Sequence, residues 1–260
     1  MKSGRGCRRE VTTSVDKDRT KAEAPPSNRR TERLVGGLDR YLGRSADALV
    51  NRFGEETAAV MRTEVLDEYR RLIPEVPYIG GWRNGHSSNL SFTARALALH
   101  RVVVRHGGSA EDTGWLLHRM MRTEMGRIPR VVRHGMGRYR FTRLAKWREE
   151  AAARTSQARR WPGDWVVERV DGDGETFDFG IDNTECGNVK FLHAQGADDL
   201  CPYICDLEYV GIEAMGYGVQ RTKTLAWGCD RCDFRFSRHA TTSAPWPPAF
   251  AERTCGKPQP

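Results

Sequence analysis

The chain has 260 residues, of which 38% are apolar, and a formal net charge of +8. This is enough to bury one sizeable core, or a core shared by two small regions. It has no apolar run near the roughly 18 residues that a membrane-spanning helix needs. Residues 1–10 are polar with no apolar stretch behind them. We therefore expect a cytoplasmic protein with no secretory signal and no membrane partner.

The positive charge is unevenly distributed. Residues 1–33 hold ten Lys and Arg against five acids, which leaves a net charge of only +3 for the remainder. Because residues 1–30 are also poor in apolar side chains, we predict a disordered basic tail there. The near-neutral remainder makes nucleic acid an unlikely partner, since phosphate binding requires a basic face on the folded part.

Residues 31–160 are predicted to form a helical region. Apolar residues recur at helical spacing in an opening stretch and in a second stretch that stops at Pro74. A third helix over 93–106 is ended by Gly107-Gly108, and Ser109 with Asp112 then predicts a capping box that opens a helix to Met125. Residues 128–137 are predicted to be irregular because of Pro129 and two glycines. A last helix is predicted over 141–160.

Residues 161–240 have a different character. Strands are predicted over 164–170 and 176–181, joined by the turn Asp171-Gly-Asp-Gly174, and again over 219–226 and 232–236. Two helices are predicted between these hairpins, over 188–195 and from Asp198 or Asp199 to Met215. This order predicts an α+β fold with an antiparallel sheet, packed with the N-terminal helical half. The Pro-rich residues 241–260 are predicted to be flexible.

Five of the seven cysteines fall between Cys186 and Cys232. In a cytosolic chain, such a cluster indicates a metal site or reactive thiols rather than disulfides. Cys201 and Cys205 share one helix face, and Cys229 and Cys232 span a turn, so four thiolates could hold zinc. A site with fewer thiolates and His193 is equally open, and so is burial of these cysteines in the core.

Three other positions carry candidate chemistry. Cys186 precedes a predicted helix, whose dipole would stabilise its thiolate, and Glu185 beside it could move protons. Cys205 and Asp206 put a thiol and an acid next to each other in a helix. Arg221 could hold a substrate carboxylate through two hydrogen bonds. For each position an ordinary structural or solvent-exposed role remains open.

The common nucleotide-binding and hydrolase motifs are missing from the sequence. It has no G-x-G-x-x-G, no P-loop, no G-x-S-x-G and no H-E-x-x-H. This argues against nucleotide-dependent chemistry and against the common serine and zinc hydrolases.

A set of short segments over about 80 residues is specific when taken together. They are Trp161-Pro-Gly-Asp-Trp-Val166, Gly172-Asp-Gly-Glu-Thr-Phe-Asp-Phe179, Thr184-Glu-Cys-Gly187 with Lys190-Phe191, Gly196-Ala197, Leu200, Pro202-Tyr203, Cys205, Arg221-Thr222, Thr224-Leu225-Ala226, Gly228 and Cys232-Asp-Phe-Arg-Phe236. This run resembles the L-2-amino-thiazoline-4-carboxylic acid hydrolases, and the helical half is similar more loosely.

The resemblance implies hydrolysis of a small carboxylate-bearing cyclic amidine at a C–N bond. In one route a cysteine attacks the amidine carbon while Glu185 or Asp206 moves protons. In the other route a divalent metal, zinc or manganese, activates water. The positions carried over from the family are Glu185, Cys186, Cys205, Arg221, Cys232 and Asp233.

Cys201 and Cys229 depart from the family pattern, which favours a site built from Cys186, Cys205 and Cys232, as nucleophiles or as metal ligands. His193 and Asp233 are further candidates for binding the small-molecule substrate. Three alternatives stay open: a ligand-binding or redox-sensing module with cysteine-bound zinc, a structural zinc domain, and a biosynthetic enzyme that opens or closes a related ring. An oligomer is compatible with the sequence.

Overall fold

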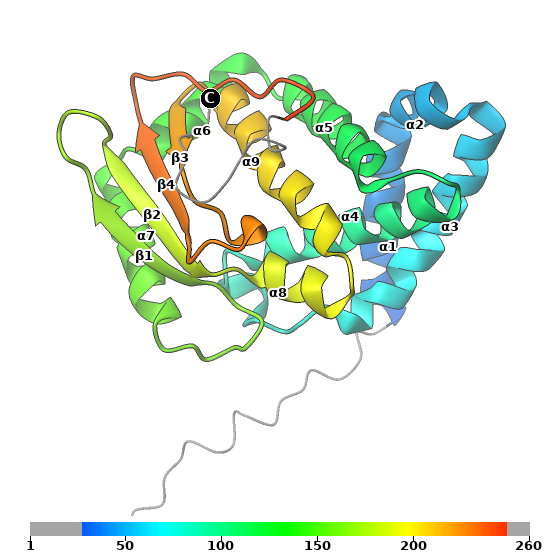
Figure 1. The fold of residues 1–260 in the computed structure, drawn as a ribbon, viewed down its shortest axis with the longest axis horizontal. Helices are drawn as coiled ribbons and strands as arrows, with labels where there is room; N and C mark the ends of the chain where they lie inside the picture. Colours follow the sequence, from blue (N-terminus) through cyan, green and yellow to red (C-terminus); the bar gives the residue numbers. More distant parts are fainter. Residues whose placement is uncertain (1–27, 249–260) are drawn as a thin grey trace, which may run out of the picture.

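A computed structural model describes residues 28–248, which fold into a helical half followed by a sheet-containing half. Figure 1 shows the four-stranded sheet on one side and the first helices on the other, with α9 between them. The helices of the first half are α1 (Asn28–Arg44), α2 (Ala46–Phe53), α3 (Glu55–Leu72), α4 (Ser87–Arg105), α5 (Ala110–Arg127), α6 (Arg130–Tyr139) and α7 (Arg143–Ser156). The second half contains β1 (Val166–Asp171), β2 (Phe179–Glu185), α8 (Gly187–Ala194), α9 (Cys201–Met215), β3 (Gly218–Arg221) and β4 (Cys232–Ser237).

The sheet is antiparallel with strand order β1-β2-β4-β3, which confirms the predicted α+β class. Phe234 pairs with Ile181 on one side and with Arg221 on the other, so these three side chains share a face. Cys232 lies on the same face, two residues before Phe234. Ile212 and Met215 of α9 pack on this face together with Phe234. The sheet therefore turns an arginine and a thiol toward the helix.

The core of the helical half is built mainly from apolar side chains, although Glu68, His100 and His118 are also buried there. Met61, Val65, Leu97 and Val102 have no exposed surface, and the same cluster continues into α8 and α9 as far as Cys186 and Cys201. Burial of such side chains stabilises the fold by about 1.5–3 kcal/mol each. One core cluster thus joins the helical half to α8 and α9, while Cys232 and Phe234 of the sheet form a separate cluster with Ile212 of α9.

The predicted capping box at the start of α5 is confirmed. The amide of Asp112 donates to Ser109 Oγ over 3.2 Å, and the carboxylate of Asp112 accepts from the amide of Ser109 over 2.8 Å. Two of the amides left unpaired at the helix start are satisfied in this way.

The prediction that residues 128–137 are irregular is wrong, because they contain most of α6. Pro129 stands at the N-cap, where a missing N–H does not interrupt the helix. Gly137 has a packing role: a Cβ there would lie 2.4 Å from the carbonyl oxygen of Met215. The glycine thus lets α6 lie directly against the end of α9.

Several predicted boundaries in the second half shift. β2 begins at Phe179 rather than 176 because Asp173 accepts from the amides of Glu175 and Thr176, which widens the turn into a loop. β3 ends at Arg221 rather than 226, since Leu225–Trp227 forms a 3₁₀ turn. The last helix of the first half, α7, ends at Ser156, short of the predicted 160.

The two predicted terminal tails lie largely outside the described residues. The predicted disordered tail covers 1–30, and the structure begins at Asn28 with α1. Of the predicted flexible segment 241–260, the structure describes 241–248. There the carbonyl of Ala244 accepts from His118 over 3.0 Å and from Arg122 over 2.7 Å, which fixes the segment to α5. Trp246 stacks on Tyr203 with ring centroids 6.1 Å apart.

Candidate functional site

The three cysteines carried over from the family lie on three different elements around the sheet face that meets α9. Cys186 is the N-cap of α8, Cys205 lies on α9 and Cys232 opens β4. All three are free thiols. Cys186 and Cys232 are buried, whereas Cys205 is only partly buried. Cys205 is therefore the most accessible of the three.

Each of these thiols is held in its neutral form. Burial raises the pKa of Cys186, and a charge on Cys205 or Cys232 would raise it further. Burial likewise raises the pKa of Cys232 to about 12, and Cys205 adds to this effect. The pKa of Cys205 lies well above its ordinary value because of a hydrogen bond with Cys201, burial and the charge of Cys201. The thiols are thus close enough to influence one another, and Cys205 affects both of the others.

Two groups favour thiolate formation. Arg221 lowers the pKa of both Cys205 and Cys232 by its positive charge. The amide of Leu225 donates to the sulfur of Cys232 over 3.3 Å. At the start of α8, the amides of Val189 and Asn188 lower the pKa of Cys186, as expected at a helix N-terminus. Burial outweighs these effects in the free protein.

Arg221 is the largest fully buried side chain of the described residues and is only 1% exposed. Its Nη1 donates to Glu208 over 3.2 Å and its Nη2 to the carbonyl of Cys205 over 3.4 Å. Its guanidinium carbon lies 5.0 Å from the ring centroids of both Tyr209 and Phe234. Within residues 28–248 its Nε has no hydrogen-bond partner. A buried cation in an aromatic enclosure keeps its full charge next to the thiols.

Glu208 is a site residue that the sequence analysis missed. It lies three residues after Cys205 and therefore on the same face of α9. The side chain is 49% exposed. Desolvation by the surrounding protein raises the pKa of its carboxyl, and the positive charge of Arg221 lowers this pKa in part. The spacing Cys205-x2-Glu208 on a predicted helix was the signal that could have found it. Glu208 connects the buried arginine to solvent.

Glu185 is already engaged in ion pairs, with Lys190 and with Arg159. Lys190 also donates to the carbonyls of Pro162 over 2.9 Å and Asp164 over 2.8 Å. Through Lys190, this carboxylate ties the end of β2 to the loop before β1. It stands next to Cys186 in the chain, but its observed contacts serve positioning.

The other predicted acids occupy different places. Asp206 is buried, and the step of one residue rotates it about 100° around α9 from Cys205. Asp233 points to the opposite face of β4 from Cys232. It accepts from the amide of Thr222 over 2.8 Å and from the amide of Lys223, so it fixes the turn after Arg221. These contacts give Asp233 a structural role.

His193 lies on the outer surface of α8. Its side chain is 77% exposed, and Nδ1 lies 3.0 Å from Asp198. It is therefore directed to solvent rather than toward the thiols.

A second histidine, which the sequence analysis did not single out, lies near Cys186. His86 stacks on Trp165 with ring centroids 4.6 Å apart. Burial lowers the pKa of His86, and Asp164 partly opposes the shift. Trp165 in turn packs on Gly187, where a Cβ would lie 2.4 Å from the ring. The loop before α4 and the loop before β1 thus form one wall beside Cys186.

The predicted metal ligands do not form a metal-binding group. Within residues 28–248, no three or more His, Cys, Asp or Glu side chains are arranged to hold an ion. The arrangement of Cys186, Cys205 and Cys232 therefore does not fit a divalent metal in this structure.

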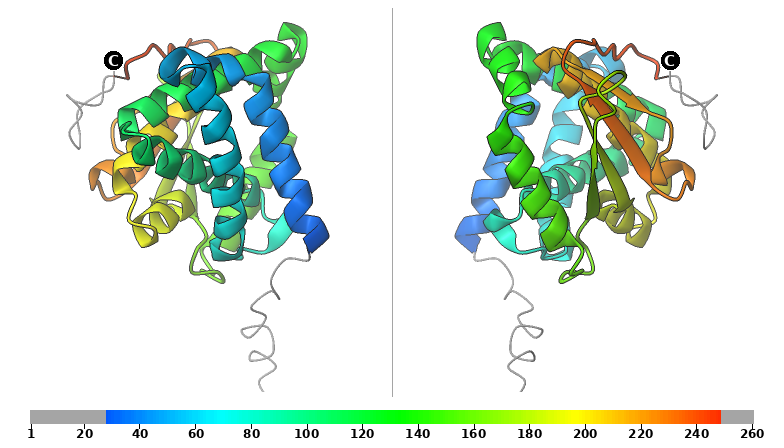
Figure 2. Two further views of the ribbon diagram at one scale, coloured as in Figure 1. Left: turned by 90° about the vertical axis from the view of Figure 1, so that its right-hand side faces the viewer. Right: turned by 90° about the vertical axis from the view of Figure 1, so that its left-hand side faces the viewer.

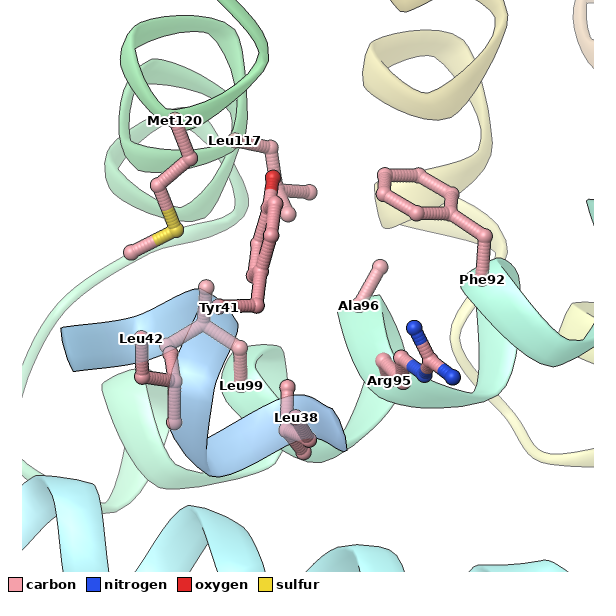
Figure 3. A pocket seen from close by; sticks show the side chains of 9 residues that line it. All are labelled: Leu38, Tyr41, Leu42, Phe92, Arg95, Ala96, Leu99, Leu117 and Met120. Carbon is pink, nitrogen blue, oxygen red and sulfur yellow. The ribbon is translucent and has the colours of Figure 1, made fainter. Parts of the chain in front are cut away.

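A different hollow lies inside the helical half, between α1, α4 and α5 (Figure 3). Its volume is about 30 Å³, and it is lined by apolar side chains together with Tyr41 and Arg95. That space admits one or a few water molecules and is too small for a ring-bearing substrate.

The fold and its side chains define an α+β protein in which a buried arginine stands beside a group of neutral thiols. A family model described as L-2-amino-thiazoline-4-carboxylic acid hydrolase matches residues 93–236, more than half of the chain. The chain therefore belongs to this family. The match runs from α4 to β4 and includes all three cysteines and Arg221. No curated protein and no solved structure matches the chain.

Proposed function

We propose that this protein is a hydrolase that opens a small, carboxylate-bearing cyclic amidine at a C–N bond, with Cys205 as nucleophile. Family membership supports the class of substrate. The observation that carries the assignment is the position of Cys205: as a residue it is less buried than Cys186 and Cys232, and its carbonyl accepts from Arg221, which also donates to Glu208.

The high pKa of Cys205 defines the first step. A neutral thiol is a poor nucleophile, but a cyclic amidine is a base. When the amidine binds next to Cys205, the thiol proton moves to the ring nitrogen and leaves a thiolate beside Arg221. The protonated amidine is then a stronger electrophile, and the ion pair forms in a site that excludes most water.

The thiolate then attacks the amidine carbon and forms a carbon–sulfur bond. The bond between that carbon and the ring nitrogen breaks, and the nitrogen leaves as an amine with the proton from Cys205 and a second proton from the exocyclic amino group, which becomes an imine on the Cys205 adduct. Water attacks the remaining adduct, its oxygen binds the carbon, and the bond to Cys205 breaks while the sulfur regains a proton. The net change is addition of one water and cleavage of one C–N bond, giving an S-carbamoyl product.

Glu208 is placed to assist the second half of the reaction. Its carboxylate is accessible to solvent and lies on the same helix face as Cys205, so it can accept the proton of the attacking water. Arg221 stabilises the thiolate each time it forms. We also propose that Arg221 holds the substrate carboxylate. Its Nε would donate the hydrogen bond, because this atom has no partner among residues 28–248.

The test is turnover of 2-amino-thiazoline-4-carboxylate by the full chain, followed by the appearance of the S-carbamoyl product and its new primary amine. We expect turnover by the wild type, a loss of about 10³-fold or more in Cys205→Ala, and wild-type rates in His193→Ala, whose side chain faces solvent. No turnover by the wild type would refute the substrate, and equal rates in both variants would refute the nucleophile. About one zinc per purified chain would support the zinc-module alternative instead.

A further inference from the structure

The helices α6 and α7 carry a high density of positive charge. Residues 127–160 hold eleven Lys and Arg but only two acids, a net charge of +9. Both acids are used within the protein: Glu149 accepts from Arg140 and Arg169, and Glu150 lies near Lys146. The near-neutral balance of residues 34–260 thus conceals a strongly basic segment, which the sequence analysis did not recognise.

The same segment also exposes apolar side chains. Within residues 28–248, eleven large apolar residues are exposed. Six of them lie on α6 or α7: Val131, Val132, Met136, Tyr139, Leu144 and Trp147. Val131 is 85% exposed and Trp147 is 60% exposed. Such a group of exposed apolar residues is typical of a surface that binds another molecule.

The apolar side chains of α6 share one face. At about 100° per residue, Val131, Val132 and Met136 fall within about 140° of each other, and Gly137 falls on the opposite side. Gly137 is the residue packed against α9. A surface helix normally turns its apolar face toward the core. α6 does the reverse, with its apolar face toward solvent and its small or charged residues toward the protein.

The second helix extends this surface. The phenol of Tyr139 at the end of α6 accepts from Arg148 of α7 over 3.1 Å. Leu144 and Trp147 lie one turn apart on α7, next to Arg148. In Figure 2, α6 and α7 follow one another along the same side of the molecule. The two helices thus present one continuous basic and apolar face.

A basic pocket lies behind α6, between α5, α6 and α9, on the side of the helix that faces the protein. It has a volume of about 310 Å³ and is lined by Arg122, Arg130, Arg133 and His134 together with Glu213. Arg122 pairs with Glu213 over 2.7 Å. In the described part of the chain, Arg130 and Arg133 form no ion pair with an acid, and Arg133 Nε has no hydrogen-bond partner. The pocket can therefore accept an anionic group of the size of a phosphate ester.

We infer that the α6–α7 face docks on the surface of an anionic lipid bilayer. Aliphatic side chains such as Val131 and Leu144 gain stability from acyl chains, whereas phosphates and bases of a nucleic acid offer them little. Trp147 suits the interface between headgroups and acyl chains. The lysines and arginines of residues 127–160 attract the anionic leaflet.

A lipid surface fits the charge of this face better than a second copy of the chain. Asp171 pairs with Lys146 and Glu185 with Arg159, which lowers the charge of the segment from +9 to +7 (9 − 2), and two copies joined through α6 and α7 would still repel each other. The expectation of no membrane partner was based on the lack of a spanning helix, and no helix of residues 28–248 is long and apolar enough to cross a membrane. Docking on the surface requires no such helix.

The test is flotation of the full chain with vesicles of phosphatidylcholine alone and of phosphatidylcholine with 30% phosphatidylglycerol. Val131→Asp is compared with Val104→Asp, which makes the same change at an exposed valine of α4. We expect binding only to the anionic vesicles, about tenfold or more weaker binding by Val131→Asp, and unchanged binding by Val104→Asp. Equal melting temperatures of the two variants show that both fold.

Three outcomes would overturn the inference. The first is no flotation of the wild type with anionic vesicles. The second is equal flotation of both variants, which would assign binding to another basic segment such as the N-terminal tail. The third is a wild-type dimer in sedimentation, or binding of RNA, that Val131→Asp abolishes while vesicles are not bound.

Discussion

The helical half and the sheet half bury different kinds of side chain. In the helical half, Met61, Val65 and Leu97 are sealed in hydrocarbon, and the buried acid Glu68 forms ion pairs with Arg71, Arg101 and Arg105. The sheet half buries Arg221 and several thiols. Burying charge opposes folding unless it is compensated. Glu68 has three cationic partners, whereas Arg221 has one acid partner and an unpaired Nε among residues 28–248, so the sheet half gives up more stability around its thiols.

The difference predicts which variants lose activity without losing stability. Arg221→Lys keeps the charge but removes the planar group that contacts both Glu208 and the carbonyl of Cys205. We expect kcat/KM for 2-amino-thiazoline-4-carboxylate to fall by about 100-fold, equivalent to about 2.7 kcal/mol of transition-state stabilisation. Steady-state kinetics measures this, and Lys223→Arg nearby is the control that should change little. A wild-type kcat/KM in Arg221→Lys would show that the guanidinium of Arg221 does not contribute to the reaction.

A second variant tests the packing of the loop before β1 against the start of α8, beside Cys186. In Gly187→Ala the new Cβ would lie 2.4 Å from the Trp165 ring and 2.5 Å from the carbonyl of Gly163. We expect the free energy of unfolding to fall by about 1–3 kcal/mol, measured by urea denaturation. The matched control is Gly211→Ala in the middle of α9, where no atom lies within 4 Å of the new Cβ. That variant should be more stable than the wild type, because alanine favours helix over glycine by about 1 kcal/mol.

The buried thiols predict a dependence of stability on alkaline pH. In the folded protein the pKa of Cys232 is raised from 9.0 to about 12. Above pH 9 the unfolded chain loses a proton that the folded protein keeps, so stability is complete below pH 9 and falls as the pH rises toward 12. The slope is about 1.4 kcal/mol per pH unit for each such thiol. Urea denaturation between pH 8 and 11 should show a shallower slope in Cys232→Ala, and equal slopes would contradict the raised pKa.

The smallest expected effect belongs to the helical half. Ser109→Ala removes one side of the capping box of α5 and should lower the free energy of unfolding by about 1 kcal/mol. The kcat/KM should stay at the wild-type value, because Ser109 touches none of the thiols. Thermal denaturation and kinetics on the same preparation check this, and a large loss of activity would show that the two halves are more closely coupled than their cores suggest.

Local signals in the sequence predicted the frame of the molecule. The Ser109–Asp112 capping box, the end of α9 at Gly216 and the β-hairpin, two helices, β-hairpin order all follow from residue types and spacing. α6 was missed because Pro129 and two glycines are breakers in isolation. Tertiary contact with the end of α9 makes one of those glycines necessary and lets the helix form.

The site was only partly predictable. Cys186, Cys205, Cys232 and Arg221 could be singled out as residue types on separate elements, but which acid would stand beside them depends on how α9 meets the sheet. That packing turns Glu208 toward Arg221, places Asp206 elsewhere on the helix, and engages Glu185 with Lys190. Spacing within one element cannot determine contacts between elements.

The measurement that tests the central claim most directly is the mass of the protein in a quenched reaction with 2-amino-thiazoline-4-carboxylate. The mechanism predicts a fraction of the chain heavier by one substrate molecule, with the added mass on the peptide that contains Cys205 and absent from Cys205→Ala. Turnover with no adduct on Cys205, or with the adduct on the peptide of Cys186 or Cys232, would contradict it.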